Sequence, residues 1–403
     1  MGISLGLVGL GSFGSSFVTL FKSHPAVDRI ALCDREPERL RHFAEQEVLS
    51  DKFDPSDAYN SLDDLLQSDI EAVVIITQHW LHTPQAVQAL DAGKHVYAAV
   101  PVLTVPDGDE ILDWCDRLVN TVERTGLHYM YGETTYYRPE AMYCRRKADE
   151  GAFGHFVHSE GEYFHDVDHG LRDVAKNRYG SAAGQEYTEE LVSRYGRVQH
   201  MAPMHYPTHS TAGPMCVMNA HAVKVACWGL RSRVHLDHFD PEDLANEIAL
   251  FQMSNGATCR IAECREVGMP GRETFRVYGT EGSFEHGKWY DKDGGVEVPP
   301  EEMFDPLPST VVESFQNRNA VSGTTQLSEQ ERKDFRGGHG GSHAYLVHEF
   351  CDAIANDRTP AVTAWDAARY TAAGVMAHKS ALSDGELLDV PDWGEPPHRR
   401  CGG

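Results

Sequence analysis

The sequence ISLGLVGLGSFG, residues 3–14, joins a short apolar run to three spaced glycines. The length of the apolar run predicts a buried strand, and Gly9, Gly11 and Gly14 then follow the pattern GxGxxG. The first glycine permits a tight turn, the second lets the backbone approach a pyrophosphate, and the third lets the next helix pack closely on the strand. The segment therefore predicts a dinucleotide-binding βαβ unit.

An acidic residue after the next strand supports this prediction. Residues 29–33 (RIALC) form a second apolar run, and Asp34 follows it, twenty residues after Gly14. A carboxylate at this point can accept hydrogen bonds from the ribose hydroxyls and repels a 2′-phosphate. We therefore expect NAD rather than NADP as the cofactor, although the adjacent Arg35 can weaken that preference.

Apolar runs and turn signals divide the chain into two parts. Strand-like and helix-like segments alternate up to about residue 130, which predicts a parallel sheet with right-handed crossovers. After about residue 150, successive strand-like runs with short turns predict a mostly antiparallel sheet. The expected fold class is α/β, with a doubly wound parallel sheet followed by a second α/β domain that has an open, mostly antiparallel sheet.

The domain limits predicted from this pattern are 1–130 for cofactor binding, 131–385 for substrate binding and oligomerisation, and 386–403 for a C-terminal tail. Residues 288–338 are rich in Pro, Gly, Ser and acidic residues, and we expect a long, partly mobile surface excursion there. Helices are predicted over 83–93, 107–126, 344–356 and 364–384.

Composition and charge exclude several classes of protein. The net charge of −25 argues against nucleic acid or an anionic membrane as a partner. No apolar run reaches the roughly 18 residues of a membrane span, and residues 1–10 lack the basic region and cleavage site of a signal peptide. The nine cysteines include no C-x-x-C pair, which favours reduced thiols in a cytoplasmic protein.

Further motifs resemble the Gfo/Idh/MocA oxidoreductases. They are LDDLL at 62–66, the run 72–77, His82, ALDAGKHV at 89–96, and, near the end, YLVHEFCDAI at 345–354 with RTP at 358–360. The resemblance implies a Rossmann domain followed by an open, largely antiparallel α/β domain, with the nicotinamide at their junction. It also implies a homo-oligomer.

One position departs from that family. Typical members read Glu-Lys-Pro after the fifth strand, and the lysine assists proton transfer, whereas this chain has Ala99, Val100 and Pro101. A valine cannot act as an acid or base. The chain instead resembles a branch of NAD-dependent glycosidases, which includes α-N-acetylgalactosaminidases and carries valine there together with a Tyr-Pro-Thr-His motif. The matching segments here are YPTH at 206–209, GE at 132–133, YR at 137–138, YFHD at 163–166 and GHGG at 338–341.

The resemblance implies a catalytic cycle and a set of residues for it. The sugar is oxidised at C3, loses its C2 proton, eliminates the C1 leaving group, adds water and is reduced again. His209 is expected to be the base at the 3-hydroxyl, Tyr206 to orient or relay that proton, and Tyr163 to act at C2 with a cationic neighbour, His165 or Arg194. The other substrate-binding residues expected are Arg194 (with Arg197 as the alternative), His165, Glu133 and His339. The expected cofactor-binding residues are Gly9, Gly11, Ser12, Phe13, Gly14, Asp34, Thr77, His79, Trp80, His82, Ala99, Val100, Glu133 and Thr134.

Three alternatives stay open at this point. A simple sugar or polyol dehydrogenase would use His209 as its only base, and a non-catalytic NAD(H)-binding regulator would need no base at all. A metal-dependent hydrolase would use the histidine pairs His165 with His169 and His205 with His209, each spaced four residues apart. We expect no metal, because the branch that the chain resembles uses none.

Overall fold

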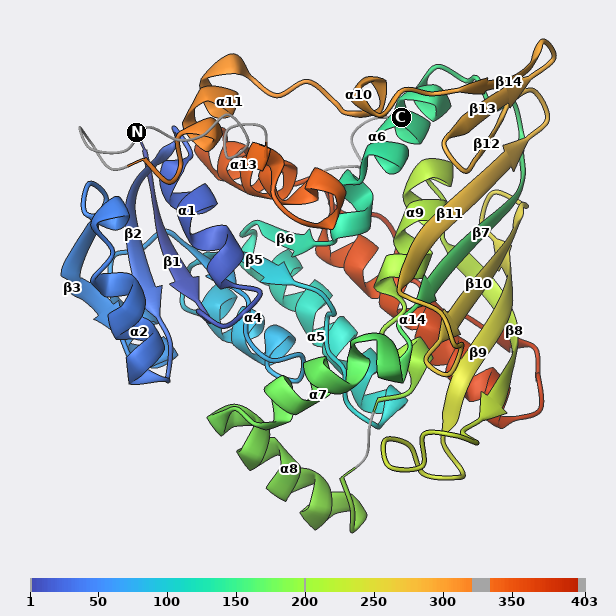
Figure 1. Ribbon diagram of the computed structural model, residues 1–403, viewed down its shortest axis with the longest axis horizontal. Helices are drawn as coiled ribbons and strands as arrows, with labels where there is room; N and C mark the ends of the chain where they lie inside the picture. Colours follow the sequence, from blue (N-terminus) through green and yellow to red (C-terminus); the bar gives the residue numbers. More distant parts are fainter. Residues whose placement is uncertain (1, 199–200, 321–333, 398–403) are drawn as a thin grey trace.

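Two β-sheets with helices between and around them make up the fold (Figure 1). The structure is a computed structural model that describes residues 2–198, 201–320 and 334–397. The first sheet is parallel and has the strand order β3-β2-β1-β4-β5-β6. Its strands are β1 (Ile3–Val8), β2 (Val27–Cys33), β3 (Phe53–Tyr59), β4 (Ala72–Ile75), β5 (His95–Ala99) and β6 (Tyr129–Gly132).

Apolar residues bury this sheet on both faces, as a parallel sheet requires. All four residues of β4 are buried, and Leu5 and Leu7 of β1 lie in the core. The strands are connected by α1 (Ser15–Ser23), α2 (Pro37–Ala44), α3 (Leu62–Gln67), α4 (His82–Asp91) and α5 (Gly108–Thr125). Helix α5 confirms the prediction for 107–126, because the Asp107 side chain caps its start and Gly126 ends it in a left-handed conformation, at φ 66°.

The second sheet has nine strands in the order β14-β13-β12-β11-β7-β10-β9-β8-β15. Every pairing in it is antiparallel except that of β7 with β10, which confirms the predicted mostly antiparallel sheet. The strands are β7 (Phe156–Phe164), β8 (Ala222–Arg231), β9 (Leu244–Met253), β10 (Thr258–Cys264), β11 (Arg272–Gly279), β12 (Ser283–Glu285), β13 (Lys288–Asp291), β14 (Gly294–Glu297) and β15 (Leu388–Asp389).

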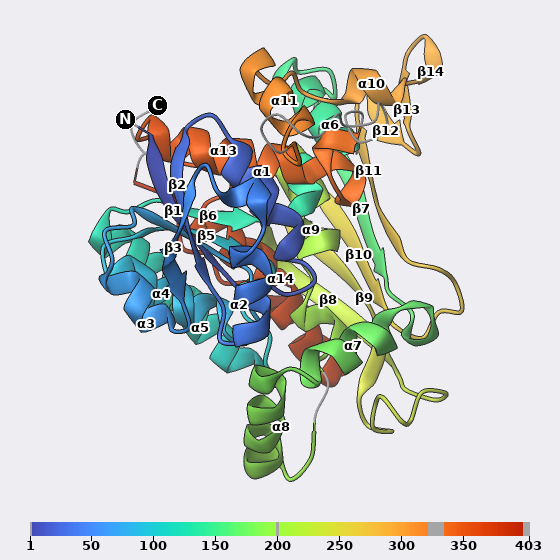
Figure 2. The same cartoon turned by 60° about the vertical axis from the view of Figure 1, so that its left-hand side comes forward.

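Helices fill the space between the two sheets (Figure 2). Helix α9 contacts β7 and β11, and α14 contacts β8 together with α5 of the first domain. The helices beyond α5 are α6 (Pro139–Asp149), α7 (Leu171–Tyr179), α8 (Ala182–Tyr195), α9 (Thr208–Met218), α10 (Pro300–Met303), α11 (Ser309–Gln316), α13 (Ser342–Ala355) and α14 (Ala364–Leu382). In the described part of the chain, no helix is long and apolar enough to span a bilayer.

The structure bears on the predicted domain limits at three places. Strand β6 continues the first sheet two residues past position 130, and β15 places an edge strand inside the segment 386–403. The segment 288–338 contains β13, β14, α10 and α11, and Val311 and Phe315 of α11 are buried in the core beneath the first sheet. Its residues 321–333 lie outside the described part. The limits themselves stay a prediction.

Candidate active site

The glycine loop lies between β1 and α1 and is shaped for a dinucleotide. Gly9 has φ 91°, and a Cβ atom there would approach the Ile76 carbonyl oxygen to 2.3 Å. A Cβ on Gly14 would lie 2.0 Å from the Gly9 carbonyl oxygen, whereas at Gly11 the nearest atom would be 3.7 Å away. The loop is thus closed on the protein side and open at Gly11, where a pyrophosphate can approach the backbone. These residues fit the expected NAD.

Asp34 lies at the carboxyl end of β2, beside this loop. Its Oδ2 accepts a hydrogen bond from the Leu10 backbone N–H at 2.7 Å, and its Oδ1 accepts one from the Glu36 N–H at 2.8 Å. The carboxylate is therefore held rigidly, with lone pairs left for ribose hydroxyls.

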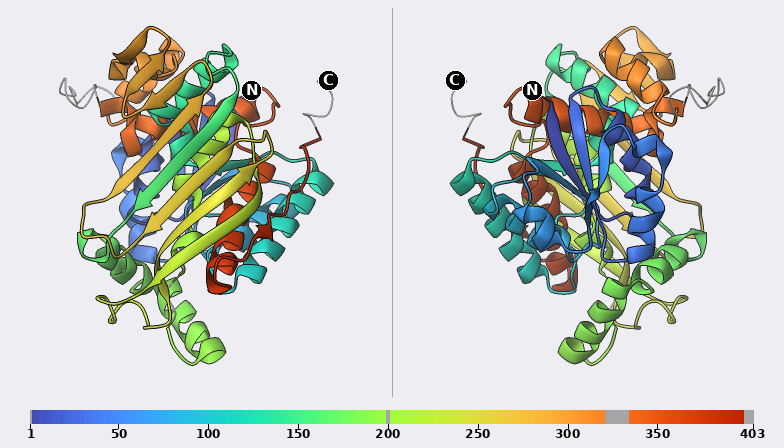
Figure 3. Two further views of the ribbon diagram at one scale, coloured as in Figure 1. Left: turned by 90° about the vertical axis from the view of Figure 1, so that its right-hand side faces the viewer. Right: turned by 90° about the vertical axis from the view of Figure 1, so that its left-hand side faces the viewer.

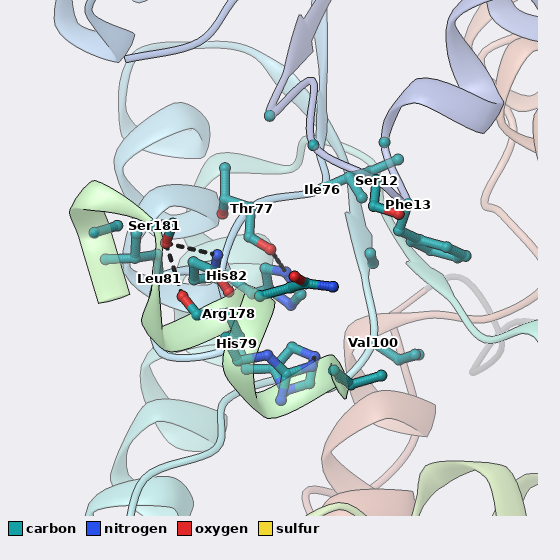
Figure 4. Close-up of a pocket in the computed structure, with 18 of the residues that line it drawn as sticks. Ser12, Phe13, Ile76, Thr77, His79, Leu81, His82, Val100, Arg178 and Ser181 are labelled. Carbon is teal, nitrogen blue, oxygen red and sulfur yellow. Dashed lines mark hydrogen bonds between the residues drawn. The ribbon is translucent and has the colours of Figure 1, made fainter. Parts of the chain in front are cut away.

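A cavity of about 860 Å³ runs from the glycine loop to the junction of the two sheets. Twelve of the fourteen residues expected to bind the cofactor line it (Figure 4). The exceptions are Trp80 and Glu133. The Trp80 ring stacks on Tyr187 with centroids 4.1 Å apart, so it packs α8 against the first domain, and Glu133 lies behind His209.

His209, Tyr206 and Glu133 form a hydrogen-bonded chain at the catalytic end of the cavity. Glu133 follows β6, and His209 lies in the first turn of α9. The His209 Nδ1 is 3.0 Å from the Glu133 Oε1, and its Nε2 is 3.1 Å from the Tyr206 hydroxyl. Glu133 is fully buried, whereas His209 and Tyr206 line the cavity. This arrangement sets the imidazole's orientation and directs its Nε2 toward the ligand side.

Two carboxylates decide the protonation of His209. Burial by itself lowers the pKa of the imidazole, but the charges of Glu133 and Glu273 outweigh it and raise that pKa to about 9. The Glu273 Oε1 lies 4.0 Å from the His209 Nδ1 and is paired with Arg138 at 2.9 Å. His209 is therefore protonated at neutral pH, and it holds a proton close to the substrate end of the cavity.

Tyr163 and His165 form a second pair across the cavity. The Tyr163 hydroxyl is 3.0 Å from the His165 Nδ1, and the rings of Tyr163 and His209 have centroids 5.0 Å apart. Burial lowers the pKa of His165 to about 4, with a contribution from Arg265, so this imidazole is neutral and can accept a proton. Burial also raises the pKa of Tyr163, against the opposing charge of Arg265.

The cationic neighbour of Tyr163 differs from both residues expected for that role. His165 is neutral near pH 7, and Arg194 points away from the cavity toward Glu110 at 2.7 Å and Glu190 at 3.3 Å. The guanidinium of Arg265 instead lies over the Tyr163 ring, 5.0 Å from its centroid. No sequence signal marked Arg265, because it lies just past β10 and reaches Tyr163 only through the parallel pairing of β10 with β7.

The arginine expected upstream of Tyr206 also differs from the prediction. Arg194 and its alternative Arg197 do not line the cavity, and Arg197 pairs with Asp240 and Asp243. Arg178 of α7 lines the cavity in their place. Ungapped spacing did not locate this arginine because α7 and α8, which were not predicted, lie between: α7 lines the cavity, whereas the end of α8, which carries Arg194, projects from the body of the protein (Figures 1 and 2).

His339 and Val100 complete the wall. His339 lines the cavity, its ring lies 6.4 Å from that of His209, and its Nδ1 is 3.0 Å from the His343 Nε2. Val100 lines the cavity at the position where typical relatives carry lysine. The Val100 side chain adds only apolar contact there.

The histidine pairs considered for a metal do not converge. His165 contacts Tyr163 and His169 contacts Asp166. The His205 Nδ1 lies 3.1 Å from the Val105 carbonyl oxygen, whereas His209 contacts Glu133, so the members of each pair have different partners. Among the residues that the structure describes, no group of three or more His, Cys, Asp or Glu side chains is arranged to hold a metal ion.

The two halves of the chain match two family models. The oxidoreductase family model with an NAD-binding Rossmann fold matches residues 3–132, and the C-terminal α/β domain model of the same family matches residues 201–387. The chain belongs to the Gfo/Idh/MocA oxidoreductase family. The match confirms the predicted Rossmann domain, its NAD cofactor and the class of NAD-dependent enzyme.

Two relatives align with different shares of the chain. It is 32% identical to a glycosyl hydrolase family 109 protein of Bacteroides fragilis over 227 residues, which cover 54% of this chain and 49% of that protein. The chain thus aligns with about half the length of that relative. It is 25% identical to an α-N-acetylgalactosaminidase of Tannerella forsythia over 99% of this chain and 88% of the relative.

Solved structures share the fold. One is the scyllo-inositol dehydrogenase of Lactobacillus casei with bound NAD(H) and scyllo-inositol, with a TM-score of 0.65 and 16% identity over 96% of this chain and 99% of that one. At this identity the likeness shows the fold alone. It confirms the predicted combination of a Rossmann domain and an open α/β domain.

Proposed function

We propose that this member of the Gfo/Idh/MocA family is an NAD-dependent glycosidase. It cleaves its substrate through transient oxidation at the sugar C3, elimination across C1 and C2, addition of water and reduction. The names of the relatives in Bacteroides fragilis and Tannerella forsythia support this class of activity.

The observation that carries the proposal is the presence of two proton-transfer pairs in one cavity. A simple alcohol oxidation needs a single base at the reacting hydroxyl. Here the pair His209–Tyr206 is accompanied by Tyr163–His165, whose tyrosine ring lies 5.0 Å from His209 and 6.3 Å from Tyr206. A second pair at that separation suits a proton on the carbon next to the oxidised one. The chemical step of a dehydrogenase does not require this second pair.

The residues divide the chemistry between them. Held by the glycine loop and Asp34, a bound NAD would supply the hydride acceptor and donor for the sugar C3. Tyr206 and the deprotonated Nε2 of His209 accept the proton of the 3-hydroxyl, while Glu133 holds the imidazole through Nδ1. The proton on C2 passes to the Tyr163 oxygen as the phenolic proton moves to the His165 Nδ1, and the bond from C1 to the leaving group breaks. The leaving group departs as an anion. Water then adds its hydroxyl at C1 and its other proton neutralises that anion, while the reverse transfers return the protons to C2 and to the 3-hydroxyl oxygen and restore every side chain.

Turnover of nitrophenyl glycosides with substoichiometric NAD tests the proposal. Many aglycones released per NAD, with no lasting absorbance at 340 nm, are expected. Stoichiometric NADH without aglycone would make the protein a dehydrogenase instead. Tight NAD binding with neither reaction on a broad panel of glycosides and sugars would favour a regulator.

We further infer that the protein is cytoplasmic and forms a homo-oligomer. The eight cysteines in the described ranges are all free, which supports a reducing compartment. The outer face of β8 and β9 carries Trp228, Leu230, Ile248 and Leu250, each at least 41% exposed. Helices cover only the other face of this sheet (Figure 3, left), so a second copy of the chain is the partner we propose for the apolar strip.

A further inference from the structure

Arg178 is a cation in the cavity without a carboxylate partner among the described residues. It lies in the last turn of α7, half-buried, and Figure 4 shows it beside His79. Its Nη2 donates to the His79 Nε2 at 2.9 Å. Within the described ranges, no other side-chain hydrogen bond and no ion pair of Arg178 is present, so its remaining guanidinium N–H groups are available to a ligand.

Two other lining arginines, Arg35 and Arg39, are exposed at the dinucleotide end, where Arg35 pairs with Glu186 and Arg39 lies beside Gly11. Arg265 pairs with Glu263 at 2.7 Å, and His209 pairs with Glu133 at 3.0 Å. The described carboxylates that line the cavity are Asp34 and Glu36, and both are at the dinucleotide end. A partly desolvated guanidinium without a counter-charge is costly, and an anionic ligand group removes that cost. In a chain of net charge −25, a cation without a counter-charge at this point of the cavity favours the entry of an anion.

His79 fixes the guanidinium without neutralising it. Burial, followed by the charge of Arg178, lowers the pKa of His79 well below 6.5, so its ring is neutral and accepts through Nε2. The ring of His79 packs on Tyr206 with centroids 5.1 Å apart. Because Arg178 donates to His79, Arg178 lies on the same side of Tyr206 as His79. Tyr163 contacts Tyr206 as well, with centroids 6.3 Å apart, and forms the second neighbour of that ring.

We propose that the substrate sugar carries a carboxylate and that Arg178 binds it, so that the substrate is the glycoside of a hexuronic acid. This inference rests on the proposed function, which places the reacting C3 hydroxyl at Tyr206 and His209. In a pyranose ring, C2 and C4 flank C3. With C2 at Tyr163, the edge from C4 to C5 faces His79 and Arg178. A planar guanidinium with free N–H groups matches a planar carboxylate at C5.

The test compares nitrophenyl hexuronides with the corresponding neutral hexosides, in the protein loaded with NAD. The wild type is expected to favour the hexuronide in kcat/KM by about tenfold to a hundredfold, the range of a charge-assisted hydrogen bond. Arg178→Met should remove that preference, lowering the ratio of kcat/KM for the hexuronide to kcat/KM for the neutral hexoside by about tenfold or more, and Arg178→Lys should retain part of it. Lys176→Met, on the exposed side of the same helix, is the matched control and should change neither value.

Two further measurements separate the possible failures. Binding of free hexuronates to the NAD-loaded protein is measured by calorimetry. The wild type could bind uronate without cleaving any glycoside, while Arg178→Met binds none. That result would support the anion site and reject the glycosidase proposal. Cleavage of neutral hexosides with no preference for hexuronides would overturn the anion site alone. Weaker NAD binding in Arg178→Met, with hexuronide selectivity unchanged, would overturn it too and assign the arginine to the cofactor phosphates.

Discussion

Glu133 and His209 form a buried carboxylate–imidazole pair, with the Glu133 Oε1 3.0 Å from the His209 Nδ1. The same Glu133 oxygen accepts the Thr135 backbone N–H at 2.8 Å, so the carboxylate cannot turn away. Glu133 binds the Nδ1 of His209, and Tyr206 contacts the Nε2 of the same ring. A substitution at Glu133 therefore alters how the imidazole holds a proton at Nε2, on the side that faces the substrate.

Glu133→Gln should move the pH dependence of activity to lower pH. His209 must lose its proton before it accepts one, so activity rises with pH through the pKa of His209, which the two carboxylates raise to about 9. Removing one charge lowers that pKa, and the rising limb of kcat/KM should move down by about one pH unit or more. An unchanged limb would exclude His209 as the group that titrates. Glu150→Gln, on an exposed carboxylate, is the control.

His209→Gln should destabilise the protein more at pH 6 than at pH 10. A group whose pKa is raised on folding contributes stability that is complete below its unfolded pKa, near 6.5, and is lost as pH rises through about 9. The difference in unfolding free energy between wild type and variant should therefore shrink across that window, by about 3 kcal/mol at most. Denaturant unfolding at several pH values measures it, and a constant difference would contradict the ion pair.

Tyr163→Phe should separate oxidation from elimination. The variant keeps His209 and Tyr206 but loses the group proposed for the C2 proton. Aglycone release should fall by about a hundredfold or more, while up to one NADH per active site still forms. Exchange of the C2 hydrogen with deuterated solvent should slow equally. Tyr290→Phe, on an exposed ring in β13, is the control. Equal loss of NADH formation and aglycone release would place Tyr163 in the oxidation step instead.

Asp34→Asn should weaken the binding of NAD and reduce the preference for NAD over NADP. The variant retains an oxygen for the Leu10 N–H but loses the charge that repels a 2′-phosphate. The dissociation constant for NAD, measured by fluorescence titration, should rise about tenfold. Asp28→Asn, on the exposed side of the same strand, should leave it unchanged. If NADP binding stays as weak as in the wild type, another residue selects the cofactor.

Leu250→Glu should dissociate the proposed homo-oligomer. Leu250 is 51% exposed on the outer face of β9, next to Ile248 and opposite Ala226 of β8. A buried, unpaired carboxylate at an apolar interface is strongly unfavourable. Light scattering with size-exclusion chromatography should show a lower mass for Leu250→Glu and no change for Gln67→Glu, at an exposed position in α3 of the first domain. A monomeric wild type would contradict the proposed homo-oligomer.

The local sequence was sufficient for the parts of the fold that depend on short-range chemistry. The glycine loop, the cap at Asp107 and the stop at Gly126 each follow from the conformations that one residue type allows. Apolar runs located most of the longer strands and the closing helices to within a few residues, because each buries a regular face, but β3 and the short strands β12, β13, β14 and β15 were not predicted. Motif similarity also found His209, Tyr206, Tyr163 and His165, which the structure brings into one cavity.

Only the tertiary structure decided which charged groups meet. Arg194 was expected at the substrate, but α8 carries it to Glu110, and α7 brings Arg178 into the cavity. Arg265 reaches Tyr163 through strand pairing, and Glu273 of β11 adds its charge to His209 from more than sixty residues away. Contacts of this kind depend on chain direction and sheet register, which no local pattern encodes. The residue types were therefore predictable, whereas the protonation of His209 and the unpaired charge of Arg178 were not.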